Sequence, residues 1–433
     1  MMIMFLLDEN LTPAAAVTEF YRLEWKRDCE GGGSFTWRIP ARLAKEVRAA
    51  RYVLYPGIEA ARAAVGQPTA AAAPAITGGH TPGAFTETGG AELGVIESVS
   101  LAEGGGLYET AGADHRETGE SVGAGSRLPG TGAYGSGVRS SGIAGAEAVV
   151  RGRLAEAVLE SRVISDALTA TGESGTDTAS ALSGTLEHVV RVLVQRYAID
   201  RPHSIPGLVL GKEEGHAERA TAGLYGGNLM SRITSLLRPY GMWYELAYDP
   251  AYPASGGTDA PETADTAPAL IFTVRKGTDR TFGQQSSSRA IFAEALGNVA
   301  SAVVRRGAPG YTVAYVAGAD AAASAVWEEA GGPRRELFVR AAGLHKGETM
   351  TDEAYTALLQ SYGREKLAAA RTPDTVTCVL TDDGFPRYGR DFRVGDRCRL
   401  ELPSCDCTAD ARLSGITQTV TPDGLTLTAE FTL

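Results

Sequence analysis

Glycine constrains this chain more than any other residue, because of where it is concentrated. Of the 53 glycines in 433 residues, 21 lie between Gly57 and Gly145. The same stretch holds the runs AAVGQPTAAAAPAITGGHTPGAF and GAGSRLPGTGAYGSGVRSSGIAGAE. Such segments bury too little apolar surface to offset the entropy lost on ordering. We therefore expect two long Gly/Ala-rich insertions, at about 57–92 and 104–146.

Between the insertions, Leu93 to Leu101 alternates in the period of two that is typical of a strand. The first 56 residues contain further strand-like runs, IMFLLD, EFYRLEWKRDCE, GSFTWRIP and RYVLYP, with a hairpin turn at Gly31 to Gly33. We expect residues 1–170 to form an antiparallel unit of five or six strands that carries both insertions.

Residues 183–283 have a different pattern, which predicts a small α+β domain. Thr185 is a suitable N-cap for a first helix, and a second helix starts at Asn228 and ends at Gly241. The first helix has its apolar positions at helical spacing, namely Leu186, Val189, Val190, Leu193 and Tyr197. Two strands follow, MWYELAY and ALIFTVRKG.

Residues 284–433 return to strands, with one helix at about 351–371. Thr351 is a good N-cap for that helix, and Asp352 and Glu353 complement its dipole. Four strands close the sequence, with a turn at Pro422 to Gly424. The fold class is therefore α+β and mostly β, with two β units flanking the α+β domain.

Charge and hydropathy narrow the class of protein. The formal net charge of −11 argues against specific nucleic-acid binding, and the arginine pairs at Arg305 and Arg334 are too short to change this. The apolar start MMIMFLL is shorter than a signal peptide, and no run approaches the 20 or so apolar residues of a membrane span. We expect a soluble protein made in the cytoplasm, without a signal peptide or membrane anchor; the resemblance described below implies that this is the cytoplasm of a host bacterium.

Cysteine and histidine offer few candidate ligands. The five cysteines are Cys29, Cys378, Cys398, Cys405 and Cys407, an odd number without a disulfide framework, and SCDC lacks the spacing of a zinc site. The best candidate for metal or acid–base chemistry is His216 with Glu213, Glu214 and Glu218. The other histidines are interpreted as exposed or structural: His80, His115, His188, His203 and His345.

Motifs for catalysis are missing from the sequence. There is no dinucleotide fingerprint, no phosphate-binding loop, no G-x-S-x-G and no H-E-x-x-H, and the Gly-Lys pair at Lys212 lacks a following Ser or Thr. We predict no catalytic, cofactor-binding or metal-binding residues, and no enzyme activity.

The order of segments resembles the ReqiPepy-type family of tail proteins from siphoviruses and prophages. The likeness rests on strand spacing and on short strings such as IPGL in the loop between the two helices, KGTDRTF, RREL and VGD. Arg340 departs from the acidic residue that the family tends to have after the RRELFV strand. The insertions have no counterpart in the pattern.

The resemblance implies a baseplate hub in the virion tail. Such a hub is a homotrimer whose two β-barrel-like, tail-tube-like domains per subunit form a pseudo-hexameric ring. It implies contacts with tail-tube proteins, the tape measure protein and a tail spike or fibre, and no cofactor.

Two alternatives stay open. A receptor- or carbohydrate-binding tail module would use surface aromatics such as Tyr108 and Tyr134 to stack on sugars. A tail-associated cell-wall hydrolase would need an acid–base pair or a metal, for which the sequence offers only the His216 cluster.

Overall fold

The computed structural model describes residues 2–66, 91–102, 146–165, 181–200, 202–223, 227–253, 266–284, 289–308, 310–321, 324–327, 333–347, 350–370, 372–381 and 385–433. Within them the fold is mostly β with few helices, as predicted. Most of the two insertions, with His80, His115, Tyr108 and Tyr134, lies outside the described residues.

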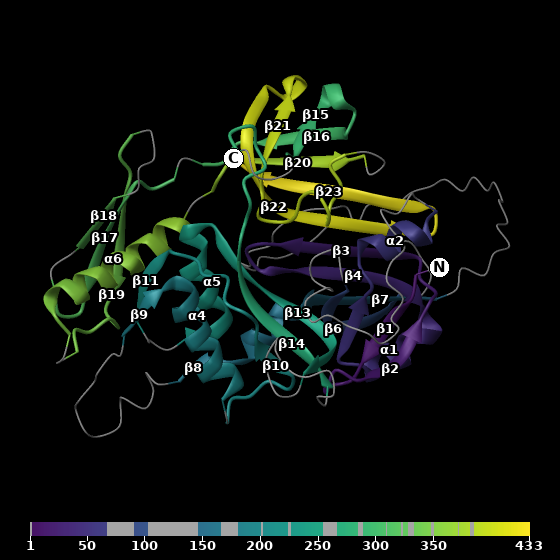
Figure 1. Cartoon of the computed structure of the whole chain (residues 1–433), viewed down its shortest axis with the longest axis horizontal. Helices are drawn as coiled ribbons and strands as arrows, with labels where there is room; N and C mark the ends of the chain where they lie inside the picture. The colour runs from purple at the N-terminus through teal and green to yellow at the C-terminus, as the bar shows by residue number, and fades with distance from the viewer. Residues whose placement is uncertain are drawn as a thin grey trace, which may run out of the picture.

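One large sheet contains strands from both ends of the chain (Figure 1). In spatial order its path is β16 (Val299–Arg305), β20 (Thr375–Leu380), β23 (Gly424–Thr432), β22 (Cys407–Thr421), β3 (Arg22–Asp28), β4 (Gly32–Pro40), β7 (Glu147–Leu154), β6 (Glu92–Ala102), β5 (Tyr52–Tyr55), β1 (Met4–Leu7) and β2 (Pro13–Val17). Off this path, β21 (Arg397–Leu402) pairs with β22, and β15 (Ile291–Ala293) pairs with β21.

The β3–β22 pairing joins the two predicted β units. Its antiparallel register runs from Leu23 opposite Val420 to Asp28 opposite Gly415. In Figure 1 the purple N-terminal strands lie directly beneath the yellow C-terminal ones. Within the described residues the path has two ends, so the predicted barrel-like closure is not found. The division at 1–170, 183–283 and 284–433 stays a prediction.

The sheet has a shared apolar core because buried positions alternate with less buried ones along most of its long strands. Trp25 of β3 stacks on Phe35 of β4 with ring centroids 5.2 Å apart, and Phe292 of β15 lies 5.2 Å from Phe431 of β23. All four belong to one core cluster that spans both ends of the chain. Burial of each such side chain contributes about 1.5–3 kcal/mol before entropy is counted.

The first segment differs from the prediction in three places. β2 was not expected, so the N-terminal part supplies seven strands rather than five or six. The first insertion begins later than Gly57, because α2 (Ile58–Ala64) buries Ile58 and Ala61. β7 is followed by η2 (Ala155–Ser161), a short helix that was not expected. η1 (Ala41–Leu43) and α1 (Ala44–Ala49) precede β5.

The middle segment forms the predicted helices. α4 (Leu186–Val194) begins after Thr185, whose side chain accepts from the His188 N–H, and continues as η3 (Gln195–Ile199). α5 (Leu229–Leu237) begins after Asn228 and ends through η4 (Arg238–Tyr240) at Gly241, which has a φ of 63°. The five predicted apolar positions of the first helix are all buried.

The strands of the middle segment correct the interpretation of IPGL as a plain loop. β13 (Met242–Pro253) and β14 (Thr266–Lys276) pair as expected, but β10 (Leu208–Leu210) starts inside IPGL and pairs in parallel with β14. The strand pairs β9 (Ala181–Thr185) with β11 (Arg219–Gly223), and β8 (Val163–Ile164) with β12 (Gly227–Asn228), were not predicted.

A third unit packs beside the middle helices. Its sheet has the order β18 (Ser324–Trp327), β17 (Val313–Gly318), β19 (Glu336–Ala341), and α6 (Asp352–Ala369) begins after the predicted N-cap Thr351. The remaining short turns are η5 (Glu294–Leu296) and η6 (Pro403–Cys405). Arg232 of α5 forms an ion pair with Glu365 of α6, and both side chains are 5% exposed. This pair therefore connects the third unit to the middle segment.

The Arg232–Glu365 pair gives a test of that connection. Breaking a buried pair on one side costs about 3–5 kcal/mol because the remaining charge is stranded. R232M and E365M should each lower the free energy of unfolding by that order, and R232M/E365M should cost less than their sum. Urea unfolding of the four proteins measures the coupling; additive costs within about 0.5 kcal/mol would contradict it.

Candidate functional site: a buried ionic junction

A cavity of about 290 Å³ lies where the first, middle and last segments meet. Its lining includes Arg27 from β3, Glu92 from β6, Glu245 from β13, Arg275 from β14, and Tyr388 and Gln418 from the last segment. The polar side chains around it form what we call the ionic junction: Arg27, Glu92, Glu156, Glu245 and Arg275.

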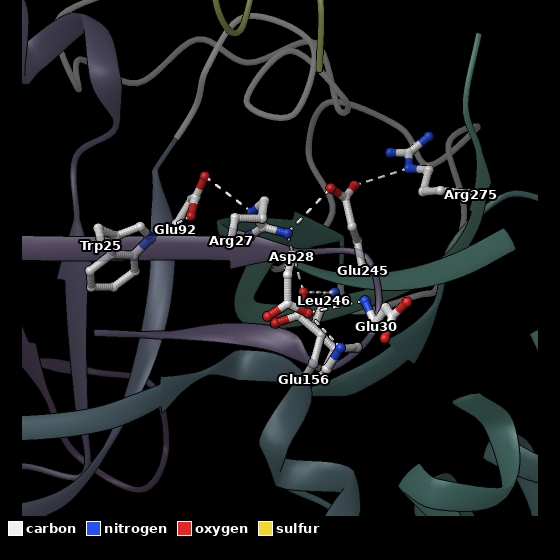
Figure 2. Close-up of polar contacts among 10 residues, drawn as sticks. Trp25, Arg27, Asp28, Glu30, Glu92, Glu156, Glu245, Leu246 and Arg275 are labelled. Atoms are coloured by element: carbon white, nitrogen blue, oxygen red, sulfur yellow. Dashed lines mark hydrogen bonds and ion pairs between the residues drawn. The ribbon is translucent and has the colours of Figure 1, made fainter. Parts of the chain in front are cut away.

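Arg27 is the centre of the ionic junction (Figure 2). Its Nε lies 3.3 Å from Glu92, and its Nη1 lies 3.3 Å from both Glu156 and Glu245. The Arg27 side chain is only 13% exposed. One guanidinium thus binds carboxylates from three separate elements, β6, η2 and β13, and the planar fork of donors of an arginine suits this better than a lysine would.

Further contacts extend the ionic junction on both sides. Glu92 accepts a hydrogen bond from the indole N–H of Trp25, which is fully buried. Glu245 lies 3.1 Å from Arg275, and Arg275 also binds Glu214. Figure 2 shows Arg27 and Arg275 approaching Glu245 from opposite sides.

The charges inside the ionic junction compensate one another. Burial disfavours the charged form of Arg27, but Glu92, Glu156 and Glu245 outweigh it and raise the pKa of this guanidinium well above its ordinary value. Burial likewise works against ionised Glu245, but Arg27 and Arg275 together hold its pKa below the ordinary value. Both groups are therefore charged at neutral pH.

Glu156 behaves differently because it is the most deeply buried carboxylate of the ionic junction. Its side chain is 1% exposed, and burial raises its pKa from 4.5 to about 7 although Arg27 opposes the shift. One oxygen accepts the Leu246 N–H at 3.3 Å. Gly32, with a φ of 82°, makes room for it, since a Cβ there would lie 2.7 Å from the Glu156 Cβ.

A second anchor lies on the far side of the cavity, at Asp396. Its carboxylate accepts from the Thr278 N–H at 2.8 Å, from the Arg393 N–H at 3.0 Å and from Arg280 Nε at 2.5 Å. Beside it, a Cβ on Gly277 would lie 1.8 Å from the Gly395 carbonyl oxygen. The strings KGTDRTF and VGD are therefore in direct contact. This contact explains why the first string has a glycine at residue 277 and why the second has an aspartate at residue 396.

The ionic junction and the Asp396 anchor hold segments together. Each carboxylate described above has an arginine or backbone N–H partner. The cations come from β3, β14 and the turn after β14, and the carboxylates from β6, η2, β13 and the turn before β21. Such a network fixes one mutual arrangement of these elements, because removing any partner strands a buried charge.

The predicted His216 cluster lies in one loop, but its carboxylates diverge. Glu213 lies 3.2 Å from Arg191, Glu214 binds Arg275, and Glu218 binds Lys276. The ring of His216 lies 3.3 Å from Glu214. The loop itself is held by Glu187 of α4, which accepts the N–H groups of residues 214, 215 and 216 at 2.8–3.1 Å. In the part of the chain that the structure describes, no group of three His, Cys, Asp or Glu side chains could hold a metal ion.

The remaining candidates are scattered. All five cysteines are free thiols; Cys407 is buried, which raises the pKa of its thiol, and Cys405 is half-buried. His188 is exposed, His203 lies near Tyr197, and the ring of His345 lies 3.4 Å from Asp320.

Sequence reasoning missed all five members of the ionic junction and singled out only Glu214, which binds Arg275 at its edge. In the sequence, Arg27 stands in a strand-like run like any exposed arginine, and Glu156 lies in a stretch without a motif. The only available signal was the glycine run at residues 31–33, where Gly32 leaves space for Glu156 as well as making the hairpin turn.

Among the described residues, no helix has both the length and the apolar character required to cross a bilayer. The family model described as Siphovirus ReqiPepy6 Gp37-like protein matches residues 129–431. No curated protein matches the chain.

Three solved structures resemble this fold weakly. They are the 43 kDa tail protein of prophage MuSo2 from Shewanella oneidensis (9% identity, TM-score 0.44, 99% of this chain and 97% of that chain), the tail protein from Neisseria meningitidis MC58 (10%, 0.46, 100% and 96%), and a chain of the phage P2 baseplate in its activated conformation (8%, 0.42, 99% and 98%). Membership of a family is inferred from the family model alone, and no argument is based on these structural likenesses.

Removal of Arg27 tests the ionic junction. R27Q leaves three carboxylates without their shared cation and should lower the free energy of unfolding by about 3–5 kcal/mol. The matched control is R22Q on the same strand, where Arg22 is 48% exposed and pairs with Glu24. The control should cost less than about 1 kcal/mol in the same chemical denaturation experiment. Equal costs for the two variants would contradict the role of Arg27.

The raised pKa of Glu156 predicts that the stability of the fold depends on pH. Between pH 4.5 and about 7 the folded protein holds a proton on Glu156 that the unfolded chain has lost, so stability contributed by this group falls as pH rises. E156Q should therefore flatten the profile of melting temperature against pH in that window, while E24Q should leave it unchanged. Parallel profiles for wild type and E156Q would show that Glu156 titrates normally.

Proposed function

The chain belongs to the Siphovirus ReqiPepy6 Gp37-like protein family, and on that premise we propose that it is a structural, non-enzymatic component of a phage or prophage tail. Its place is the tail tip or baseplate, where it acts as a hub between the tail tube and the distal spike or fibre. The observation that supports this most is the continuous sheet built from both ends of the chain and fixed by the ionic junction.

The two ends of that sheet support a homotrimer. Among the described strands, β16 and β2 each pair on one side only. Unpaired strand edges readily accept a strand from another chain, and a head-to-tail contact repeated three times closes a ring. Each subunit would contribute two β units, which become barrel-like through the neighbouring copies and match the six-fold symmetry of a tail tube.

The same proposal gives the partners and the location. The hub would contact tail-tube proteins, the tape measure protein and the spike or fibre within the virion tail. A chain with a net charge of −11 suits a lumen through which DNA slides, because like charges repel.

Solution mass tests the proposal directly. Light scattering at several concentrations should give three times 45.3 kDa, and negative-stain images of the same sample should show a ring in end view. A monomer at every concentration, with no ring among the images, would contradict the hub.

Val303 on the edge strand β16 gives a sharper test. This side chain is 55% exposed, and a lysine there should oppose strand addition and shift the protein from trimer towards monomer. Val163, 51% exposed on β8 outside the large sheet, provides the control V163K. If the V303K trimer dissociates on dilution no more readily than the wild-type trimer, β16 does not form the contact between subunits.

A further inference from the structure

A groove of about 1110 Å³ separates α6 from the β21–β22 hairpin and lies outside the ionic junction. The η4 turn and the ends of β20 and β23 complete its walls. Its volume exceeds the usual 300–1000 Å³ of small-molecule pockets, so its size suits a segment of a macromolecule.

Two arginines face each other across the hairpin on the wall of this groove. Arg397 of β21 and Arg412 of β22 are direct partners in the antiparallel register. Side chains at such positions lie on the same face of the sheet, and like charges placed there destabilise the pair. Among the described residues, neither arginine has a carboxylate within ion-pair distance.

Two donor atoms of Arg412 also lack hydrogen-bond partners among the described residues. Its Nε and Nη2 are buried without a hydrogen-bond partner among the described residues, and its guanidinium lies 5.5 Å from the centre of the Trp243 ring. Buried polar atoms are nearly always satisfied in folded proteins, so the Arg412 guanidinium lacks an internal acceptor. A ligand in the groove would reach these two donors only after the side chain turns away from Trp243. A carboxylate is the acceptor that fits a guanidinium edge best.

The lining carboxylates of the groove are already engaged. Glu430 lies 3.1 Å from Lys26, Glu30 lies 3.3 Å from Arg238, and Asp410 lies 3.3 Å from Arg399. Asp28 accepts two backbone N–H groups. Opposite the hairpin, α6 adds Arg364, which is exposed and has no carboxylate partner in the described part of the chain. Among the described residues, three arginines of the groove therefore have no carboxylate at ion-pair distance, and Asp279 acts on Arg397 only from farther away.

A second arginine pair in the same sheet shows the contrast. Arg22 of β3 and Arg38 of β4 are also direct cross-strand partners. There, however, each arginine has its own carboxylate: Glu24 for Arg22, and Glu147 at 3.7 Å for Arg38. The fold thus compensates one arginine pair from within and leaves the other uncompensated.

We propose that this groove binds an acidic segment of a partner protein, with one carboxylate bridging Arg397 and Arg412 and another reaching Arg364. A carboxylate-rich peptide fits better than nucleic acid, because a flexible peptide can turn some of its carboxylates away from the four that line the groove, whereas a nucleic acid carries a phosphate at every nucleotide. The inference does not depend on the trimer or on a place in the tail.

Fluorescence anisotropy tests the proposal on the full chain. The probe is fluorescein-labelled poly-L-glutamate of about ten residues, compared with a glycine–serine peptide and an oligothymidylate of the same length. Poly-L-glutamate should bind, and binding should weaken as salt rises because exposed charges are screened. R397Q/R412Q should weaken it about tenfold or more, since charge-assisted hydrogen bonds are lost.

The matched control is R22Q/R38Q, which removes the same charge from the compensated pair and should leave the affinity unchanged. R397Q/R412Q should melt at or above the wild-type temperature, since it removes like charges from facing positions, so lost binding would not reflect unfolding. The proposal is overturned if poly-L-glutamate does not bind, if both double variants bind it equally, or if oligothymidylate binds more tightly.

Discussion

The interaction on which the rest of the structure depends is the binding of three carboxylates by Arg27. Glu92, Glu156 and Glu245 come from β6, η2 and β13, so the guanidinium is satisfied only when all three elements are in place. Arg27 also lies in the strand that pairs with β22. The same residue thus links the first segment to the middle one, beside the pairing that links it to the last.

Local structure could be predicted from the sequence because its causes are local. Thr185, Asn228 and Thr351 cap the helices that they were expected to cap, and alternating residues mark most of the strands. The pairing of β3 with β22 could not be predicted, since nearly 400 residues separate the two strands and no motif records their register. The parallel pairing of β10 with β14 could not be predicted either, because Leu208 follows a proline and a glycine that indicate a turn.

The candidate site shows the same contrast between features with local causes and contacts between residues far apart in the sequence. The strings KGTDRTF and VGD could be recognised in the sequence. Their physical role could not, because it depends on an ion pair between Arg280 and Asp396 that forms only in the folded chain. The His216 cluster was visible because its members are close in sequence, and its carboxylates point to different cations in the structure. Proximity in sequence was therefore a poor guide to convergence, whereas the ionic junction is assembled from residues far apart.

Charge has different roles inside this fold and on its surface. Inside, cations and carboxylates pair across segments and fix one arrangement of the sheets. In the groove between α6 and the β21–β22 hairpin, Arg364, Arg397 and Arg412 have no carboxylate at ion-pair distance among the described residues. The end strands β16 and β2 of the large sheet each pair with one described strand. We propose these two surfaces as the places where the protein joins its neighbours.

Amide hydrogen exchange of the native protein tests most directly whether the two ends of the chain form one unit. If the ionic junction and the β3–β22 pairing hold them together, the amides of β3 and β22 should exchange with the same free energy of opening, close to that of global unfolding. Rapid exchange throughout β3 and β4 while β22 and β23 stay protected would contradict this account, because the first segment would then open on its own.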